Sequence, residues 1–152
     1  MAIRGIVKEG DEALTKKCRE VTEFNERLSV LIDDMFDTMY EANGVGLAAP
    51  QVGILRRIVV IDVGEGPIEL VNPVIIASSG KQKAVEGCLS CPGIYGYTKR
   101  PMHVKVRAQD RKGVFHEYEG EDLLARAFCH EIDHLDGILF RSHVVEYVNV
   151  ED

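Results

Sequence analysis

The first clear pattern of apolar positions lies between Asn25 and Gly44. Apolar residues recur there at intervals of three and four and form one stripe, as on the buried face of a helix: Leu28, Leu31, Ile32, Met35 and Met39. Asn25 is a suitable N-cap, and Asn43-Gly44 is a suitable C-terminal stop. The pattern predicts an amphipathic helix whose stripe packs in the core.

The next part of the chain reads differently. Two glycines and a proline in residues 44–51 argue against a regular element there. Strands are expected at residues 57–62, 69–76, 102–108, 113–119 and 143–150, which are rich in β-branched or alternating apolar residues. Asn72-Pro73 predicts an edge strand or a break, and residues 110–113 predict a hairpin turn.

A second helix is expected to begin near Gly120 to Asp122 and to end at Gly137, with Glu121 and Asp122 favourably placed for the helix dipole. Strands grouped between two helices favour an α+β fold. We expect short antiparallel strands packed around a central helix, with a further N-terminal helix. The 152 residues suit a single catalytic domain covering residues 1–152.

Composition narrows the possible partners. The formal net charge of -7 argues against a general nucleic-acid binder, although a local basic patch stays compatible with it. No apolar run approaches the length of a membrane span, and the N-terminus lacks the apolar core of a secretory leader. We therefore expect a cytoplasmic protein with no membrane partner and no specific nucleic-acid partner, whose four cysteines are reduced thiols or metal ligands.

The strongest chemical signal is the segment from His130 to His134. Two histidines four residues apart lie on one face of a helix, where both imidazoles can bind one metal ion. Glu131 between them can then act as general base on a water that the metal acidifies. The alternative is a chance arrangement on a solvated helix face.

A catalytic metal usually has three protein ligands and one open position, so a third ligand is needed. A related protease motif has a third histidine six residues after the second, but Phe140 stands there, and His143 comes three residues too late. Glu146 and Glu151 are weak candidates in a short tail. Cys88 is the better candidate, because a thiolate is a strong ligand for zinc or ferrous iron.

Three segments together resemble the peptide deformylase family. They are Gly44-Val45-Gly46-Leu47-Ala48-Ala49-Pro50-Gln51, then Glu86-Gly87-Cys88-Leu89-Ser90, then His130-Glu131-Ile132-Asp133-His134. Their order and spacing match the family over nearly the whole chain. The resemblance implies a metallohydrolase that cuts the formyl group from N-formylmethionyl peptides of nascent proteins and releases formate.

The resemblance also implies a role for each residue. The metal ligands would be Cys88, His130 and His134, and Glu131 would move the proton from water to the leaving amine. The side chain of Gln51 and the backbone N–H of Leu89 would stabilise the oxyanion. Gly46 would let the peptide approach the backbone closely. An apolar pocket for the methionine side chain is expected from Val45, Leu124, Ala127, Phe128 and Cys129.

The resemblance implies one divalent metal ion per chain as cofactor. The expected ion is Fe2+, the usual metal of the family, and Zn2+ or Ni2+ can replace it in preparations.

Two departures from the family stand out. Cys129 replaces a frequent glutamine before the His-Glu pair, and the chain ends in a strand-like segment where some members carry a long ribosome-docking helix. The nascent formylated chain is the expected partner, and docking on the ribosome by that helix is not expected.

Other readings stay open. Cys88 and Cys91 form a C-x-x-C that, with the two histidines, could close a structural zinc site, although 38 residues between Cys91 and His130 and the proline after Cys91 argue against it. A redox role for the same pair lacks the expected βαβ setting. A general metallopeptidase would share the helix motif without needing Gln51 or Cys88. Asp133 either caps or forms a salt bridge within its own helix, or it orients a ligating imidazole.

Overall fold

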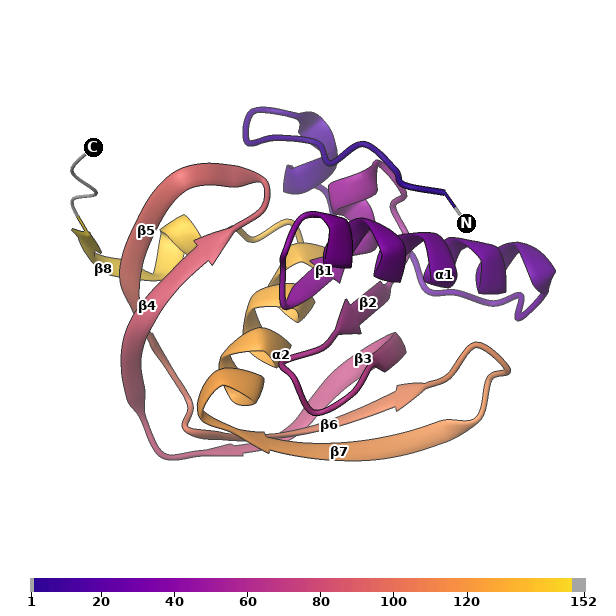
Figure 1. Ribbon diagram of the computed structural model, residues 1–152. Coiled ribbons are helices and arrows are strands. Elements are labelled where there is room, and N and C mark those ends of the chain that lie inside the picture. The colour runs from indigo at the N-terminus through magenta and orange to yellow at the C-terminus, as the bar shows by residue number, and fades with distance from the viewer. Residues whose placement is uncertain (1, 149–152) are drawn as a thin grey trace.

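A computed structural model describes residues 2–148 and shows two helices and two antiparallel sheets (Figure 1). The five-stranded sheet has the order β1 (Gly46–Ala48), β2 (Ile58–Ile61), β3 (Ile68–Ser79), β6 (His103–Gln109) and β7 (Phe115–Glu121). The three-stranded sheet has the order β4 (Gln82–Cys88), β5 (Cys91–Arg100) and β8 (Val144–Val148). The helices are α1 (Glu26–Glu41) and α2 (Asp122–Leu135), and short 3-10 turns cover Glu12–Thr15, Ala49–Val52 and Phe140–His143. The predicted α+β class is confirmed.

Strand β2 is buried on both of its faces because a helix covers each of them. Ile58 and Val60 belong to one apolar cluster with the stripe of α1. Val59 and Ile61 point the other way and pack in a second cluster with α2. Successive side chains of a strand alternate between faces, so one short strand serves both cores. Helix α2 lies between the two sheets (Figure 1).

Helix α1 forms as its sequence predicts. The side chain of Asn25 accepts the backbone N–H of Leu28 at 3.2 Å and caps the first turn. At the other end Asn43 adopts a left-handed φ of 56°, and the N–H of Gly44 donates to Met39 O. Of the predicted stripe, Leu31 is only partly buried.

Two expectations for the strands are corrected. Residues 44–51 are not irregular throughout, because Gly46–Ala48 forms β1 and pairs with β2. Of the two alternatives for Asn72-Pro73, the edge strand is wrong, because β3 is the central strand of its sheet, and the break is confirmed. The register of β3 against β6 shifts between Val71 and Val74, and Asn72 has a φ of 53°. This bulge takes proline, which has no N–H, out of the ladder.

The hairpin of β4 and β5 was not expected from the sequence. Its buried positions include the polar residues Gln82, Glu86, Thr98 and Arg100, whereas Val85 is exposed. The usual alternation of apolar inside and polar outside is therefore reversed, which hides the strand pattern.

The remaining elements follow the predictions closely. Strands β6 and β7 pair as a hairpin, and Val104 and Val106 are both buried. Helix α2 covers Asp122–Leu135, and β8 covers Val144–Val148; residues 149 and 150 of the expected last strand lie outside the described residues. Within residues 2–148, neither helix has the length and apolar character needed to cross a bilayer.

Two glycines with left-handed backbones give a test of packing at the end of α2. Gly137 has φ 75°, and a Cβ there would lie 2.6 Å from the backbone of Thr15. Gly53 has φ 81° but faces open space. We expect Gly137→Ala to lower the free energy of unfolding by about 2–5 kcal/mol, from backbone strain and overpacking together, and Gly53→Ala by about 1–2 kcal/mol from strain alone.

Urea unfolding of the two variants beside the parent protein measures both losses. Equal losses would contradict the close contact between the N-terminal segment and Gly137.

Candidate metal centre

Three side chains from two elements meet at the base of a cleft. Cys88 ends β4, while His130 and His134 lie one turn apart on α2. One ligand atom of each lies within 4.8 Å of the other two, and Cys88 Sγ is 3.4 Å from His134 Nε2. The structure thus brings together the three ligands expected from the sequence.

The donor set fits a divalent cation. Glu86 Oε1 lies 3.0 Å from His130 Nδ1, which leaves Nε2 of that ring free to face the cluster. Burial, together with the positive charges of His130 and Arg100, lowers the pKa of His134 to about 3, so its imidazole is neutral and can donate a lone pair. One thiol and two imidazoles suit zinc or ferrous iron and leave a coordination position open.

His130 is in a different electrostatic state. Burial alone would lower its pKa, but the charge of Glu131 and hydrogen bonds with Cys88 and Glu86 raise the pKa well above its usual value. A cation that binds at this ring would therefore displace a proton. Phe140, at the position where a related motif has its third histidine, stacks on His130 with ring centroids 5.8 Å apart.

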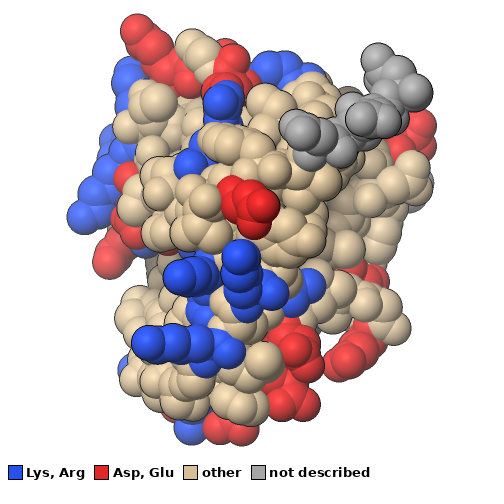
Figure 2. All heavy atoms as spheres, turned by 90° about the vertical axis from the view of Figure 1, so that its left-hand side faces the viewer, with Lys and Arg blue, Asp and Glu red and all other residues tan. Residues whose placement is uncertain are grey.

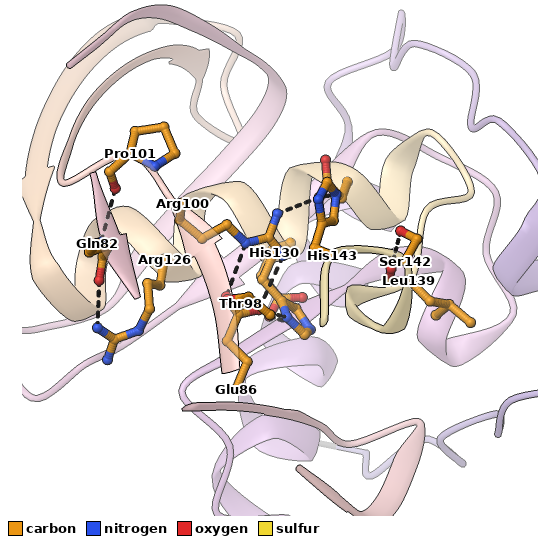
Figure 3. A network of polar contacts seen from close by, with 12 residues as sticks. Gln82, Glu86, Thr98, Arg100, Pro101, Arg126, His130, Leu139, Ser142 and His143 are labelled. Atoms are coloured by element: carbon orange, nitrogen blue, oxygen red, sulfur yellow. Dashed lines mark hydrogen bonds and ion pairs between the residues drawn. The ribbon is translucent and has the colours of Figure 1, made fainter. Parts of the chain in front are cut away.

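A buried ion-pair network contacts His130 at Nδ1, on the side of the ring away from the ligand cluster (Figure 3). Arg100 donates from Nε to Glu86 Oε2 at 3.0 Å and from Nη2 to Glu86 Oε1 at 3.1 Å, and the Thr98 hydroxyl donates to the same carboxylate. Burial opposes ionisation of Glu86, but the hydrogen bonds from His130 and Arg100 outweigh it and lower its pKa to about 2. Glu86 is therefore an anion that fixes the orientation of His130.

Sequence reasoning missed this role of Glu86, although the residue stands in the same short motif as Cys88. Neither reading of Asp133 describes its side chain, which forms ion pairs with residues outside its own helix. Asp133 Oδ2 accepts from Arg100 Nη1 at 2.8 Å and lies 3.1 Å from His143 Nε2. Within the described residues, no hydrogen bond joins Asp133 to either ligating imidazole.

Glu131 is buried beside the cluster, with Oε2 3.9 Å from His130 Nε2. Its Oε1 has no hydrogen-bond partner among residues 2–148. Burial is the main cause that raises the pKa of Glu131 to about 7, a value suited to proton transfer near neutrality. The structure gives a reason for glycine at position 46 that the sequence did not reveal. A Cβ there would lie 2.6 Å from Glu131 Oε2. Its glycine makes room for this carboxylate, as well as lining the cleft.

Gln51 is held in one orientation. Its Oε1 accepts the backbone N–H of Ala48 at 3.0 Å, which points its amide nitrogen toward Ser90 Oγ, at 3.1 Å, and Cys88 Sγ, at 3.6 Å. Ser90 is fully buried and was not singled out from the sequence. The amide N–H groups of Gln51 therefore lie next to the three-ligand cluster.

The cleft above the cluster has a volume of about 270 Å3. Val45, Gly46, Leu89 and Ala127 line it as expected, but Leu124, Phe128 and Cys129 do not. Those three belong to the core against the five-stranded sheet, where Phe128 is completely buried. The face of α2 that meets the cleft carries Leu123 and Arg126, which were not expected there, beside the expected Ala127, His130 and Glu131. The prediction chose a neighbouring face of the correct helix.

Cys91 stands apart from the cluster. It is buried, and its thiol donates to Glu9 Oε2 at 3.4 Å. Burial is the first cause that raises the pKa of Cys91 to about 12. Among the described residues, the ligand atoms that converge are those of Cys88, His130 and His134 and not that of Cys91, so this geometry does not form the closed four-ligand site.

Comparison with known protein families gives one consistent match. A family model described as polypeptide deformylase matches residues 3–149. A peptide deformylase of Caldanaerobacter subterraneus subsp. tengcongensis is 57% identical over 152 residues, which cover 100% of this chain and 96% of that protein. One of Agathobacter rectalis is 62% identical over 144 residues, covering 95% and 91% of the two chains.

Solved structures agree. The peptide deformylase from Thermotoga maritima superposes with a TM-score of 0.93 at 43% identity, covering 95% of this chain and 99% of that one. The enzyme from Legionella pneumophila gives a TM-score of 0.92 at 49% identity, covering 94% and 86%.

The contact between Glu86 and His130 should support metal binding, because it fixes the orientation of a ligating ring. We expect Glu86→Gln to weaken Zn2+ or Fe2+ binding by about 10–100-fold, because the ring loses its anionic partner. Competition with a chromogenic chelator measures the affinity.

Asp133→Asn is the matched control, since Asp133 shares Arg100 with Glu86 but does not touch a ligating ring. If both variants bind metal as tightly as the parent protein, Glu86 does not position His130.

Because Cys91 lies outside the three-ligand cluster, the two cysteines should differ in their effect on metal content. Cys91→Ser is expected to leave the metal content at one ion per chain, whereas Cys88→Ser is expected to remove most of it, because only Cys88 belongs to the cluster. Elemental analysis of the purified variants measures this. Loss of metal from the Cys91 variant would restore the closed four-ligand site.

Proposed function

The chain belongs to the polypeptide deformylase family, hydrolases that remove the formyl group from N-formylmethionyl peptides, and we propose that it acts through one divalent metal ion held by Cys88, His130 and His134. The observation that carries this proposal is the convergence of those three ligand atoms within 4.8 Å at the base of a cleft, next to the buried carboxylate of Glu131.

Ferrous iron is the proposed ion in the cell, and zinc or nickel can occupy the same ligands in preparations, because a thiolate with two imidazoles accepts all three. When bound, the ion supplies Lewis acidity that polarises the formyl group and acidifies the attacking water. The remaining work falls to the side chains around it.

Glu131 carries the proton. Its unpartnered Oε1 is available to accept a proton from the attacking water, and the same carboxyl then gives a proton to the leaving amine as formate departs. A pKa near 7 lets one group do both at neutral pH. Gly46 keeps the carboxylate close to the ligands by leaving no Cβ in its way.

Gln51 and Leu89 are the proposed donors to the oxyanion that develops on the formyl oxygen. Because the Ala48 N–H holds the carbonyl end of the Gln51 side chain, its amide nitrogen stays beside Cys88, where the N–H that faces the thiol can donate to the formyl oxygen. The backbone N–H of Leu89, at the turn after Cys88, would be the second donor. Such donors are typically worth about 2.7–4 kcal/mol of transition-state stabilisation each.

The methionine side chain is proposed to enter the apolar part of the cleft, between Val45 on one side and Leu123 with Ala127 on the other. Leu124 and Phe128 are not proposed again for this pocket, because they face the core. The partner is the nascent formylated polypeptide, so the enzyme would work in the cytoplasm, where ribosomes release such chains.

A general metallopeptidase is the competing function, since it would share the helix motif. The positioned amide of Gln51 and the thiol ligand Cys88 favour the deformylase, because the competing function needs neither. Hydrolysis of formylated peptides, with none of acetylated peptides or internal peptide bonds, separates the two.

The experiment is formate release from a formyl-Met-Ala-Ser peptide by protein loaded with Fe2+ under anaerobic conditions. We expect rapid release by the parent protein and a loss of about 10²–10⁴-fold in kcat for Glu131→Gln, which removes the proton carrier but keeps the side chain's shape.

The variant must still bind one metal ion, so that the loss reports the carboxylate and not the ligands. No release by the metal-loaded parent protein would refute the proposal. Full activity in the Glu131→Gln variant would keep the proposed metal site but would show that Glu131 does not carry the proton.

A further inference from the structure

The outer face of the three-stranded sheet carries basic and aromatic side chains that the proposed reaction does not use. Lys83 on β4 stands directly opposite Lys99 on β5, and Val85 stands opposite Tyr97. Both lysines are exposed, and so is Lys81 in the turn before β4. Figure 2 shows this side of the molecule, with blue side chains gathered across its middle.

The arrangement of the two lysines is unfavourable within the protein alone. Like charges directly opposite each other on neighbouring strands repel and destabilise a sheet. Lys83 has partial relief, because its Nζ lies 3.8 Å from Glu146 Oε2 and 5.3 Å from the centre of the Tyr97 ring. Within residues 2–148, no carboxylate forms an ion pair with Lys99. An external anion would relieve the repulsion.

The lysine pair and Lys81 stand out against the acidic balance of the whole sequence, which has 25 acidic and 18 basic residues. Among the described residues, Glu146 is the only carboxylate that forms an ion pair with any of Lys81, Lys83 and Lys99, although other acidic side chains lie elsewhere on this face in Figure 2. These lysines would attract an anionic partner, whereas the net negative charge of the chain as a whole would repel it.

Aromatic rings on the same sheet narrow the class of anion. Tyr97 lies between the lysine pair and the cleft, and Tyr95 is 43% exposed at the rim of the cleft. Platforms for single-stranded nucleic acid combine cations that follow the phosphates with rings on which bases stack. An acidic peptide would use the lysines but would have no use for the rings.

We propose that Lys81, Lys83, Lys99 and Tyr97, on the outer face of β4 and β5 and in the turn before them, form a docking surface for single-stranded RNA without sequence preference, in which the lysines bind phosphates and the Tyr97 ring contacts a base. RNA is chosen over DNA because formylated chains emerge beside RNA, a choice that rests on the proposed function. The surface lies beside the cleft and does not include its ligands, so a bound RNA would leave the cleft open to a peptide.

The test is fluorescence anisotropy with a labelled mixed-sequence RNA of about 20 nucleotides, titrated with the holoenzyme at about 50 and 200 mM salt. The test variant is Lys83→Gln with Lys99→Gln. The matched control removes two exposed lysines elsewhere, Lys17→Gln with Lys112→Gln; Lys112 lies in the β6–β7 turn, at the opposite end of the molecule from β4 in Figure 1.

We expect the parent protein and the control to bind with Kd near 10⁻⁵ M at the lower salt, which is in the range of non-specific nucleic-acid binding. The test variant should bind about tenfold more weakly, and the slope of log K against log salt should fall by about 1.4, because two phosphate contacts are lost. Formate release from formyl-Met-Ala-Ser should be unchanged in both variants, which shows that they are folded and keeps this test separate from that of the proposed function.

Three outcomes would overturn the proposal. The parent protein could fail to bind the RNA at the lower salt. The two double variants could weaken binding equally, which would mean that net charge and not this face is responsible. Polyglutamate could bind the face while RNA does not, which would make an acidic protein the partner.

Discussion

The structure around the cleft depends on one buried anion. Glu86 is enclosed by His130 from α2 and by Thr98 and Arg100 from β5, and it stays ionised because those partners supply hydrogen bonds and charge. Removing one partner from such a group is costly, since the charge that remains has no access to water. The hairpin and the helix are therefore committed to one relative position, in which the thiol of Cys88 lies next to two imidazoles. The network makes a rigid base from elements that are far apart in sequence.

The sequence predicts the elements whose apolar residues follow a regular period. Helix α1 follows its stripe and its caps, and β6 with β7 follow alternation across a turn. The β4–β5 hairpin escapes the same reasoning because its inward positions hold Glu86 and Arg100 instead of apolar residues. Polar residues placed inside for function break the pattern by which a strand is recognised. The ligand set is predictable from motif spacing, whereas Glu86 as a support for His130 is not, because nothing in the spacing says which partner its carboxylate meets.

Errors at finer scale have a similar origin. The resemblance implies that Leu124 and Phe128 line the substrate pocket, yet they share α2 with the ligands without sharing a face, because each step along a helix turns the side chain by about 100°. Leu123 faces the cleft instead, beside Ala127, which was expected there. The glycine-rich segment before Gln51 was expected to be irregular, but Gly46 belongs to a strand and is small because Glu131 occupies the space beside it. A position can require glycine because a neighbouring side chain fills the space of a Cβ, and not only because the backbone turns there.

The positions of Cys88 and His134 in the chain have a further consequence. They are 46 residues apart and lie on a strand and on a helix, so one ion bound to both would act as a removable cross-link that closes a long loop. Because the ion would bind the assembled ligands of the folded protein and not the unfolded chain, its binding free energy would stabilise the native state alone. The cofactor would then set the lifetime of the protein as well as its chemistry. A cell short of the metal would lose the enzyme to unfolding and proteolysis, and the supply of the ion would control the amount of protein present.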